Sequence, residues 1–428
     1  MVAVGSCIGS GIFVTPSQVA RHVGSPELII AVWALGGLIA LTGALTFAEL
    51  GGMFPKAGGV YVYLREAYGD LAGFWYGWAY FIVINSGGLA ALSLAFAYYV
   101  GFLVPLTPGG QTFVAVAALA VATTINIFRV KLVEIFADTF TVLKLVGIAG
   151  IVVVGIALGS GGANWGEVTT ARESTTLSGF GLALVGVFFS YGGWQHATYL
   201  SGEARDAQRT VPIAMVLGAV IVTATYVAIN VAFLLLMPVA DMAASPSVAA
   251  DAISTVLPFG ARIIAVIIAI STFGTVLIYT LSAPRIYFAM AEDGLFFKPF
   301  ARVHPKFRTP VVSVIFQSLW AILLIFAWKT FEQVITYVTF TDWIFFTLAA
   351  CIVVVFRIKR PQAERPYRTF GYPIVPLIFI TVSSLFILNT LIERPVQALW
   401  AIGLLLAGLP FYYWFKRRQP PQTAEGGP

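Results

Sequence analysis

Apolar residues fill most of the chain in long runs that short polar turns separate. A run of about 20 apolar residues is long enough to cross a bilayer as a helix, and the sequence holds twelve such runs. Their predicted limits are 1–20, 27–53, 71–104, 111–128, 133–158, 177–200, 211–237, 262–290, 310–327, 331–356, 373–391 and 396–415. The pattern predicts an all-α polytopic membrane protein with twelve transmembrane helices.

Composition and charge agree with this class. Hydrophobic residues make up 59% of the chain and charged residues 10%, whereas soluble domains carry about 25% charge. Lys and Arg gather in cytoplasmic loops of membrane proteins. One side of the predicted bundle holds most of them: Lys56, Arg65, Arg129, Lys131, Arg205, Arg209, Lys298, Arg302, Lys306, Arg308, Arg357, Lys359, Arg360, Arg365, Arg368, Lys416, Arg417 and Arg418. The opposite side holds Arg21, Arg172, Arg262, Lys329 and Arg394.

This asymmetry predicts a protein integral to the cytoplasmic membrane with both termini in the cytoplasm. The net charge of +6 follows from the same rule. The basic turns face the anionic leaflet, so we predict the lipid bilayer, and no nucleic acid, as their partner.

Glycine and serine interrupt the first predicted span at 5–13, which reads Gly-Ser-Cys-Ile-Gly-Ser-Gly-Ile-Phe. Glycine costs a helix about 1 kcal/mol relative to alanine. An unwound backbone persists in a membrane only where protein buries it or where it lines a cavity. The stretch therefore predicts a broken helix. A binding site for a small solute and close helix packing of small residues are both open interpretations of the break.

A second interruption lies in the sixth span at 188–196, which reads Phe-Phe-Ser-Tyr-Gly-Gly-Trp-Gln-His. Spans one and six correspond if spans one to five and six to ten are two copies, the second inverted because five is odd. We predict repeats at 1–160 and 161–360, two further helices at 361–416 and a disordered cytoplasmic tail at 417–428. Interrupted helices at matching positions of inverted halves indicate the midplane site of a secondary transporter.

Six short stretches resemble those of a known family. They are 5–16 (GSCIGSGIFVTP), 55–65 (PKAGGVYVYLR), 189–194 (FSYGGW), 199–205 (YLSGEAR), 271–274 (STFG) and 357–361 (RIKRP). In this order they are similar to the amino acid, polyamine and organocation transporter superfamily, and to its L-type amino acid transporter branch. The resemblance implies the LeuT-type 5+5 inverted repeat with helices 1 and 6 broken, two extra C-terminal helices, and transport of amino acids.

An amino acid is a zwitterion, so its site needs donors for a carboxylate and acceptors for an ammonium. Backbone N–H groups at the start of a helix can bind the carboxylate, and free carbonyls near Cys7, Phe189 and the residues beside them can bind the ammonium. The predicted substrate-binding residues are Ile8, Gly9, Ser10, Gly11, Phe189, Ser190 and Gly192, with free donors at Gly9, Ser10 and Gly11. The resemblance further implies that Phe189 is a gate that closes over the substrate.

Lys144 lies thirteen residues after Lys131, which places it roughly 20 Å along the fifth span. A cation at this depth is costly and should face the bundle interior, although a lysine that snorkels to the surface is the alternative. The resemblance suggests that its ammonium replaces a sodium ion that joins spans one and eight in related transporters. Ser271 and Thr272 would offer hydroxyls to the coupling ion or to the first helix.

Other polar residues in the spans have open roles. Asp342 is interpreted either as a proton-coupling group or as a hydrogen-bonded structural carboxyl. His196 is interpreted as a satisfied interior histidine rather than a proton relay. Tyr191 and Trp194 could form pocket wall or packing. The three histidines show no metal-ligand spacing, so we predict neither metal nor cofactor.

These observations predict a sodium-independent transporter of neutral amino acids that works by alternating access and exchanges substrates. Proton symport, and transport of a cationic amino acid or polyamine bound by Asp342, are the alternatives. The sequence contains no cluster of catalytic residues that would predict an enzyme. The turn 105–110 lacks the cysteine by which heteromeric animal members bond a heavy subunit, so we expect no disulfide-linked partner; the oligomeric state is open. Met1 precedes Gly5 by four residues, which indicates a truncated start or a short inner gate.

Overall fold

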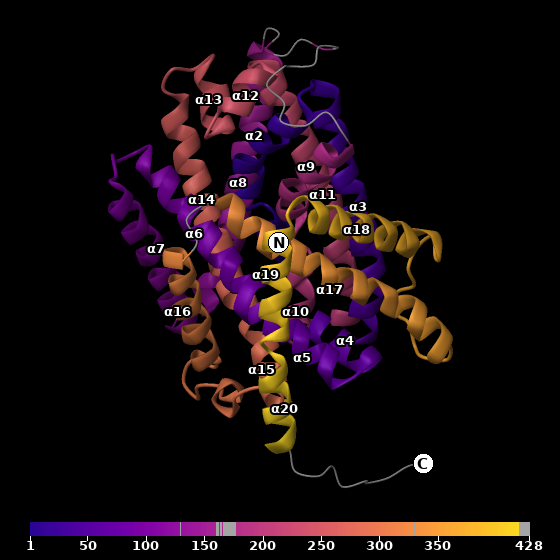
Figure 1. The fold of residues 1–428 in the computed structure, drawn as a ribbon. Coiled ribbons are helices and arrows are strands. Elements are labelled where there is room, and N and C mark those ends of the chain that lie inside the picture. Colours follow the sequence, from indigo (N-terminus) through magenta and orange to yellow (C-terminus); the bar gives the residue numbers. More distant parts are fainter. Residues whose placement is uncertain (129, 160–161, 163–164, 166–176, 328–330, 419–428) are drawn as a thin grey trace.

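Helices form all the regular structure that is described for this chain. The computed structural model describes residues 1–428 apart from 129, 160–161, 163–164, 166–176, 328–330 and 419–428. Figure 1 shows the helices packed side by side into one bundle, from which α20 extends at the lower end. The prediction of an all-α protein is confirmed for the described residues.

Nine helices are described between the start of the chain and residue 158. They are α1 (Val2–Cys7), α2 (Gly11–Val23), α3 (Pro26–Met53), α4 (Val60–Tyr68), α5 (Asp70–Ala79), the π-helix η1 (Tyr80–Ile84), α6 (Asn85–Gly101), α7 (Pro108–Phe128) and α8 (Val130–Leu158). Local sequence explains the limits of several of them. At the start of α3, for example, the Ser25 side chain accepts a hydrogen bond of 3.3 Å from the Leu28 N–H and Pro26 occupies the first turn, a strong helix start.

The second half begins after the gap that ends at 176. Its helices are α9 (Leu177–Tyr191), α10 (His196–Tyr199), the 3₁₀ turn η2 (Ser201–Glu203), α11 (Ala207–Leu236), α12 (Val239–Ala244), α13 (Val248–Ser254), α14 (Gly260–Ser282), α15 (Pro284–Glu292), the 3₁₀ turn η3 (Lys298–Ala301), α16 (Val311–Ala327) and α17 (Phe331–Lys359). Three more helices follow: α18 (Ile374–Glu393), α19 (Pro395–Leu406) and α20 (Leu409–Arg418).

Nine segments of the described residues are long and apolar enough to cross a membrane. They are Pro26–Met53, Asp70–Gly101, Pro108–Phe128, Ile135–Leu158, Ala207–Leu236, Gly260–Glu292, Val334–Lys359, Ile374–Glu393 and Pro395–Arg418. The other three predicted spans fall on the α1–α2 pair, on α9 with α10, and on α16. The chain is therefore an integral membrane protein. The count of twelve spans, the LeuT-type repeat and the repeat boundaries stay predictions.

The outer surface of the bundle is apolar, as a bilayer requires. Large apolar side chains lie exposed on helices of the periphery: Phe113, Val146, Leu323 and Leu388. Such a surface would be an interaction site on a soluble protein, and here it matches lipid.

Two helix ends that differ from the predicted limits are those of α6 and α20. Some residues on which predictions rest are not among those that the structure describes. The third span ends as a helix at Gly101, three residues before its predicted limit. Helix α20 continues through Arg418, two residues into the predicted tail, and the rest of that tail, 419–428, lies outside the described residues. Arg129, Arg172 and Lys329, which contribute to the charge asymmetry, lie outside them as well.

The two interrupted helices lie at the centre of the bundle. Helix α1 packs against α8, α11 and α14, and α2 lies along α9. Segments nearly 180 residues apart in the sequence thus meet at the breaks, which positions the candidate site.

Candidate functional site

Both predicted interruptions are breaks in the helices. Helix α1 ends at Cys7 and α2 begins at Gly11, so the backbone of Ile8, Gly9 and Ser10 lies between two helix ends. Helix α9 ends at Tyr191 and α10 begins at His196. Side chains at both breaks are buried, so these helix ends face protein or an internal cavity rather than lipid.

Glycine allows the two breaks to touch. A Cβ atom on Gly11 would lie 2.5 Å from Ser190 Oγ and 2.8 Å from Ser190 Cα. Gly193 has φ +131°, and a Cβ there would lie 2.6 Å from the Cys7 nitrogen. The Ser6 hydroxyl donates to the Gly193 carbonyl at 2.8 Å. The small residues therefore serve close packing as well as helix breaking, and the interpretation of the first break as a binding site stays a prediction.

Tyr226 of α11 connects the two breaks. Its hydroxyl lies 2.8 Å from the Cys7 carbonyl oxygen and 3.0 Å from the Ser190 carbonyl oxygen. These two carbonyls, which were predicted to be free, are thus occupied by a tyrosine in this structure. No local pattern distinguishes Tyr226, because one tyrosine in an apolar span has no distinctive neighbours in the sequence.

Lys144 of α8 is bound to the end of α1. Its ammonium donates to the Ile8 carbonyl at 2.6 Å, to the Gly5 carbonyl at 2.9 Å and to Thr275 Oγ1 of α14 at 3.2 Å. Only 1% of its surface is exposed, so the lysine does not snorkel to the membrane surface. One cation joins α1, α8 and α14 at the place where the family resemblance implied an ion.

Hydroxyls of α14 complete this contact. Ser271 Oγ lies 3.3 Å from the Ile8 carbonyl, and Thr275 Oγ1 lies within 3.3 Å of both the Gly5 and Ile8 carbonyls. Thr272 Oγ1 is buried without a hydrogen-bond partner among the described residues. Thr275, which the sequence analysis missed, follows Ser271 by one helical turn, and that spacing was the available signal.

The start of α2 offers donors for an anion. The first N–H groups of a helix have no partner within it, and here they belong to Gly11 and its neighbours. Ser10 Oγ is fully buried without a partner among the described residues. The prediction of a free N–H at Gly9 is wrong, because this N–H donates to the Cys7 carbonyl at 2.8 Å. The remaining groups are donors of the kind that binds anions at a positive helix end.

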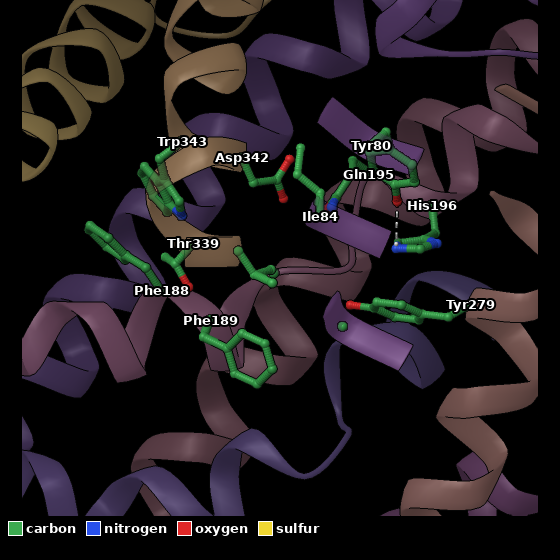
Figure 2. Close-up of a pocket in the computed structure, with 13 residues that line it drawn as sticks. Tyr80, Ile84, Phe188, Phe189, Gln195, His196, Tyr279, Thr339, Asp342 and Trp343 are labelled. Carbon is green, nitrogen blue, oxygen red and sulfur yellow. Dashed lines mark hydrogen bonds between the residues drawn. The ribbon is translucent and has the colours of Figure 1, made fainter. Parts of the chain in front are cut away.

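A cavity of about 30 Å³ lies beside the second break. It is lined by Tyr80, Ile84, Gly88, Phe188, Phe189, Gly192, Gln195, His196, Tyr279, Val338, Thr339, Asp342 and Trp343. Of the predicted substrate residues only Phe189 and Gly192 line it, whereas Ile8, Gly9, Ser10, Gly11 and Ser190 lie at the helix breaks. Figure 2 shows Phe189 on the side of the cavity away from Asp342.

Asp342 of α17 is the acidic side chain among the lining residues. It is 8% exposed, and its Oδ1 atom has no hydrogen-bond partner among the described residues. Leaving a buried polar atom unpaired costs about 1–3 kcal/mol. One oxygen of this carboxyl is thus available to a ligand or a proton (Figure 2).

Other candidates have structural surroundings. His196 Nδ1 lies 2.6 Å from Ser282 Oγ and Nε2 lies 3.3 Å from Tyr80 Oη, which is the satisfied interior histidine that we predicted. The Tyr191 hydroxyl donates to the Trp33 carbonyl at 2.9 Å. Trp194 packs edge-on against Phe47. Neither aromatic lines the cavity, so both belong to the packing. Among the described residues no cluster of His, Cys, Asp and Glu could hold a metal ion.

Charged contacts close the end of the bundle that is predicted to be cytoplasmic. Asp293 accepts from Arg65 and from the Tyr61 hydroxyl, each at 2.7 Å. Burial, with the Asp293 charge as a second cause, raises the pKa of Tyr61, so this hydroxyl remains a donor. Glu49 accepts two hydrogen bonds from Arg357 and one from Arg365.

At the opposite end, hydroxyl and carbonyl groups join α2, α6 and the turn before α13. The Tyr99 hydroxyl donates to the Phe13 carbonyl of α2 at 3.4 Å, and the Ser247 hydroxyl, just before α13, lies 3.2 Å from Tyr99 Oη. The candidate site thus lies between two closures of different chemistry.

Comparisons with known proteins extend over almost the whole chain. A family model described as amino acid permease matches residues 1–412. The serine/threonine exchanger SteT of Bacillus subtilis is 32% identical over 98% of this chain and 95% of its own length. The human b(0,+)-type amino acid transporter 1 is 32% identical over 97% of this chain and 86% of its own length. The human large neutral amino acids transporter small subunit 2 is 32% identical over 96% of this chain and 78% of its own length.

Proposed function

Because the chain belongs to the amino acid permease family, we propose that it is a sodium-independent exchanger of neutral amino acids that works by alternating access. The observation that carries the proposal is the meeting of two broken helices beside Lys144 and a cavity that Phe189 and Gly192 line. Relatives described as exchangers and as amino acid transporters support the choice of substrate class.

Substrate would bind between the two breaks. Its carboxylate would accept from the N–H groups at the start of α2 and from the Ser10 hydroxyl, whose oxygen has no other partner among the described residues. Its ammonium would bind the second lone pairs of the carbonyls at the end of α9, beside Phe189, Ser190 and Gly192, where the Ser190 carbonyl already accepts from Tyr226 and the Phe189 carbonyl from the Gly192 N–H. Phe189, which is half-buried and lines the cavity, would close over the bound molecule.

Lys144 supports independence from sodium. The ammonium already donates hydrogen bonds to the carbonyls of Gly5 and Ile8, which are the ligands that a sodium ion would need there. Ser271 and Thr275 would hold the lysine and α1 in register. A second cation beside this ammonium would meet strong repulsion.

The cavity favours a small substrate whose side chain donates a hydrogen bond. Its volume of about 30 Å³ is room for roughly two water molecules, and the unpaired oxygen of Asp342 can accept from a hydroxyl. Serine and threonine fit both properties. The same carboxyl favours proton symport as the second candidate function, since a carboxyl that binds and releases a proton could couple to transport.

Counterflow in proteoliposomes tests exchange and its independence from sodium. Labelled serine should enter vesicles preloaded with unlabelled serine, and entry into empty vesicles should be at background. Replacing sodium with choline should leave the rate unchanged. Entry into empty vesicles that an inward proton gradient drives would instead favour symport, and a requirement for sodium would contradict the role given to Lys144.

We further propose that the protein acts without a disulfide-linked subunit, since the turn 105–110 contains no cysteine. The proposed arrangement has inverted repeats at 1–160 and 161–360 and both termini in the cytoplasm. Cysteine labelling from each side of sealed vesicles, at residues introduced after Arg418 and in the turn 105–110, would test this topology.

A further inference from the structure

Two adjoining cavities lie at the end of α20, far along the chain from the candidate substrate site (Figure 1). The larger has a volume of about 630 Å³ and is lined by Gly294, Phe296, Phe297, Lys298, Pro299, Trp414, Phe415 and Arg418. The smaller, of about 330 Å³, is lined by Phe297, Pro410, Phe411 and Trp414. Phe297 and Trp414 belong to both, so the cavities are neighbours.

The larger cavity is basic. Lys298 and Arg418 line it, and the Arg418 guanidinium lies 4.0 Å from the centre of the Trp414 ring, which fixes its position over that ring. None of the described residues that line this cavity carries a carboxylate. The acidic residues just before it in the chain, Glu292 and Asp293, line a different cavity.

The smaller cavity is apolar. Phe297, Phe411 and Trp414 are 38%, 41% and 41% exposed, respectively, although each is large and hydrophobic. Phe411 and Trp414 lie one helical turn apart, so the apolar surface runs along α20 away from its basic end. The apolar segment Pro395–Arg418, which is long enough to cross a membrane, ends at the same basic turn. The larger cavity therefore lies at the level of the membrane surface and the smaller one deeper.

We propose that these two cavities together bind one anionic phospholipid. The headgroup phosphate would accept charge-assisted hydrogen bonds from Lys298 and Arg418, and an acyl chain would lie against Phe297, Phe411 and Trp414. Anionic headgroups bind in basic pockets at the cytoplasmic side of membrane proteins. The apolar cavity selects a lipid over a free phosphate, which would leave that surface uncovered. The inference is independent of the proposed transport function.

Native mass spectrometry of the full chain in an equimolar mixture of phosphatidylglycerol and phosphatidylcholine tests the site. The protein should retain phosphatidylglycerol preferentially. In a Lys298→Gln/Arg418→Gln variant the preference should fall roughly tenfold or more, since the headgroup loses its charge-assisted hydrogen bonds to both residues. A Lys416→Gln/Arg417→Gln variant removes the same charge from the same helix end outside the cavity and should keep the preference. Phe411→Ser should weaken retention of phosphatidylglycerol while leaving the basic residues in place.

Several results would overturn the proposal. Equal retention of the two lipids by the natural chain would show that the cavities do not select charge. An equal loss in the Lys416/Arg417 control would show diffuse attraction to the basic turn. Displacement of the lipid by millimolar inorganic phosphate, or full retention in Phe411→Ser, would show a free-anion site without an acyl-chain component.

Discussion

The ammonium of Lys144 compensates two carbonyls that the break in α1 leaves without helical partners. Replacing it with alanine removes two hydrogen bonds from a charged donor, at about 1.5–3 kcal/mol for each, and leaves the Gly5 and Ile8 oxygens with only the hydroxyls of Thr275 and Ser271 as donors. We predict that Lys144→Ala lowers serine exchange at least tenfold and lowers the melting temperature in detergent. The exposed Lys359 at the end of α17 provides a matched control, and Lys359→Ala should exchange within twofold of the natural rate. A folded Lys144→Ala protein that exchanges at the natural rate would refute this role.

Asp342 should determine which side chains the cavity accepts. A hydrogen bond to a charged group contributes about 1.5–3 kcal/mol, so serine should compete for uptake at least tenfold better than alanine. We predict that Asp342→Ala brings this ratio close to one, and that Asp342→Asn, which keeps an acceptor oxygen, retains part of it. Asp138→Asn, at an exposed carboxylate of α8, should keep the natural ratio. The assignment fails if Asp342→Ala discriminates serine from alanine as well as the natural chain does.

At the scale of helices, the contact between α2 and α9 depends on the absence of a side chain at Gly11. An alanine there would place its Cβ 2.8 Å from Ser190 Cα, so backbone must move and the breaks must separate. We predict that Gly11→Ala reduces exchange strongly and lowers the melting temperature. A Cβ atom on Gly150 of α8 would meet no other atom within 4 Å, so Gly150→Ala should be neutral or stabilising by up to about 1 kcal/mol. Similar behaviour of the two variants would contradict the packing argument.

The helix breaks were predictable from the sequence because the preference of glycine against helix is local. Lys144 was predictable for a related reason, since a cation deep in an apolar span must find acceptors. The cavity was not, because its walls come from α6, α9, α14 and α17, and their alignment depends on packing across the bundle. Tyr226 and Thr275 were missed for the same reason: polar atoms in apolar spans reveal a role only when their partners are placed.

At the scale of the whole molecule, alternating access requires that the closure at each end can open while the other stays shut. Apolar packing alone does not provide contacts that break at one end and hold at the other. The contacts described at the two ends involve different chemical groups. Hydroxyl and carbonyl groups hold α2 and α13 together at one end, and charges hold α4 and α15 together at the other. Loss of the Arg65–Asp293 ion pair should therefore open the end that is predicted to be cytoplasmic.

Cys7 reports this opening, because it is 3% exposed at the end of α1. Gly59, at the start of α4, lies against Thr198 of α10, and α10 packs against α1. In a Cys351→Ser background, Asp293→Asn removes the ion pair with Arg65 and should raise the rate at which a permeant maleimide labels Cys7 by roughly fivefold, since a partly exposed ion pair contributes up to about 1 kcal/mol. Glu66→Gln removes the exposed pair with Arg360 and should leave the rate unchanged. An unchanged rate in Asp293→Asn, or an equal rise in Glu66→Gln, would show that the Arg65–Asp293 contact does not hold this end closed.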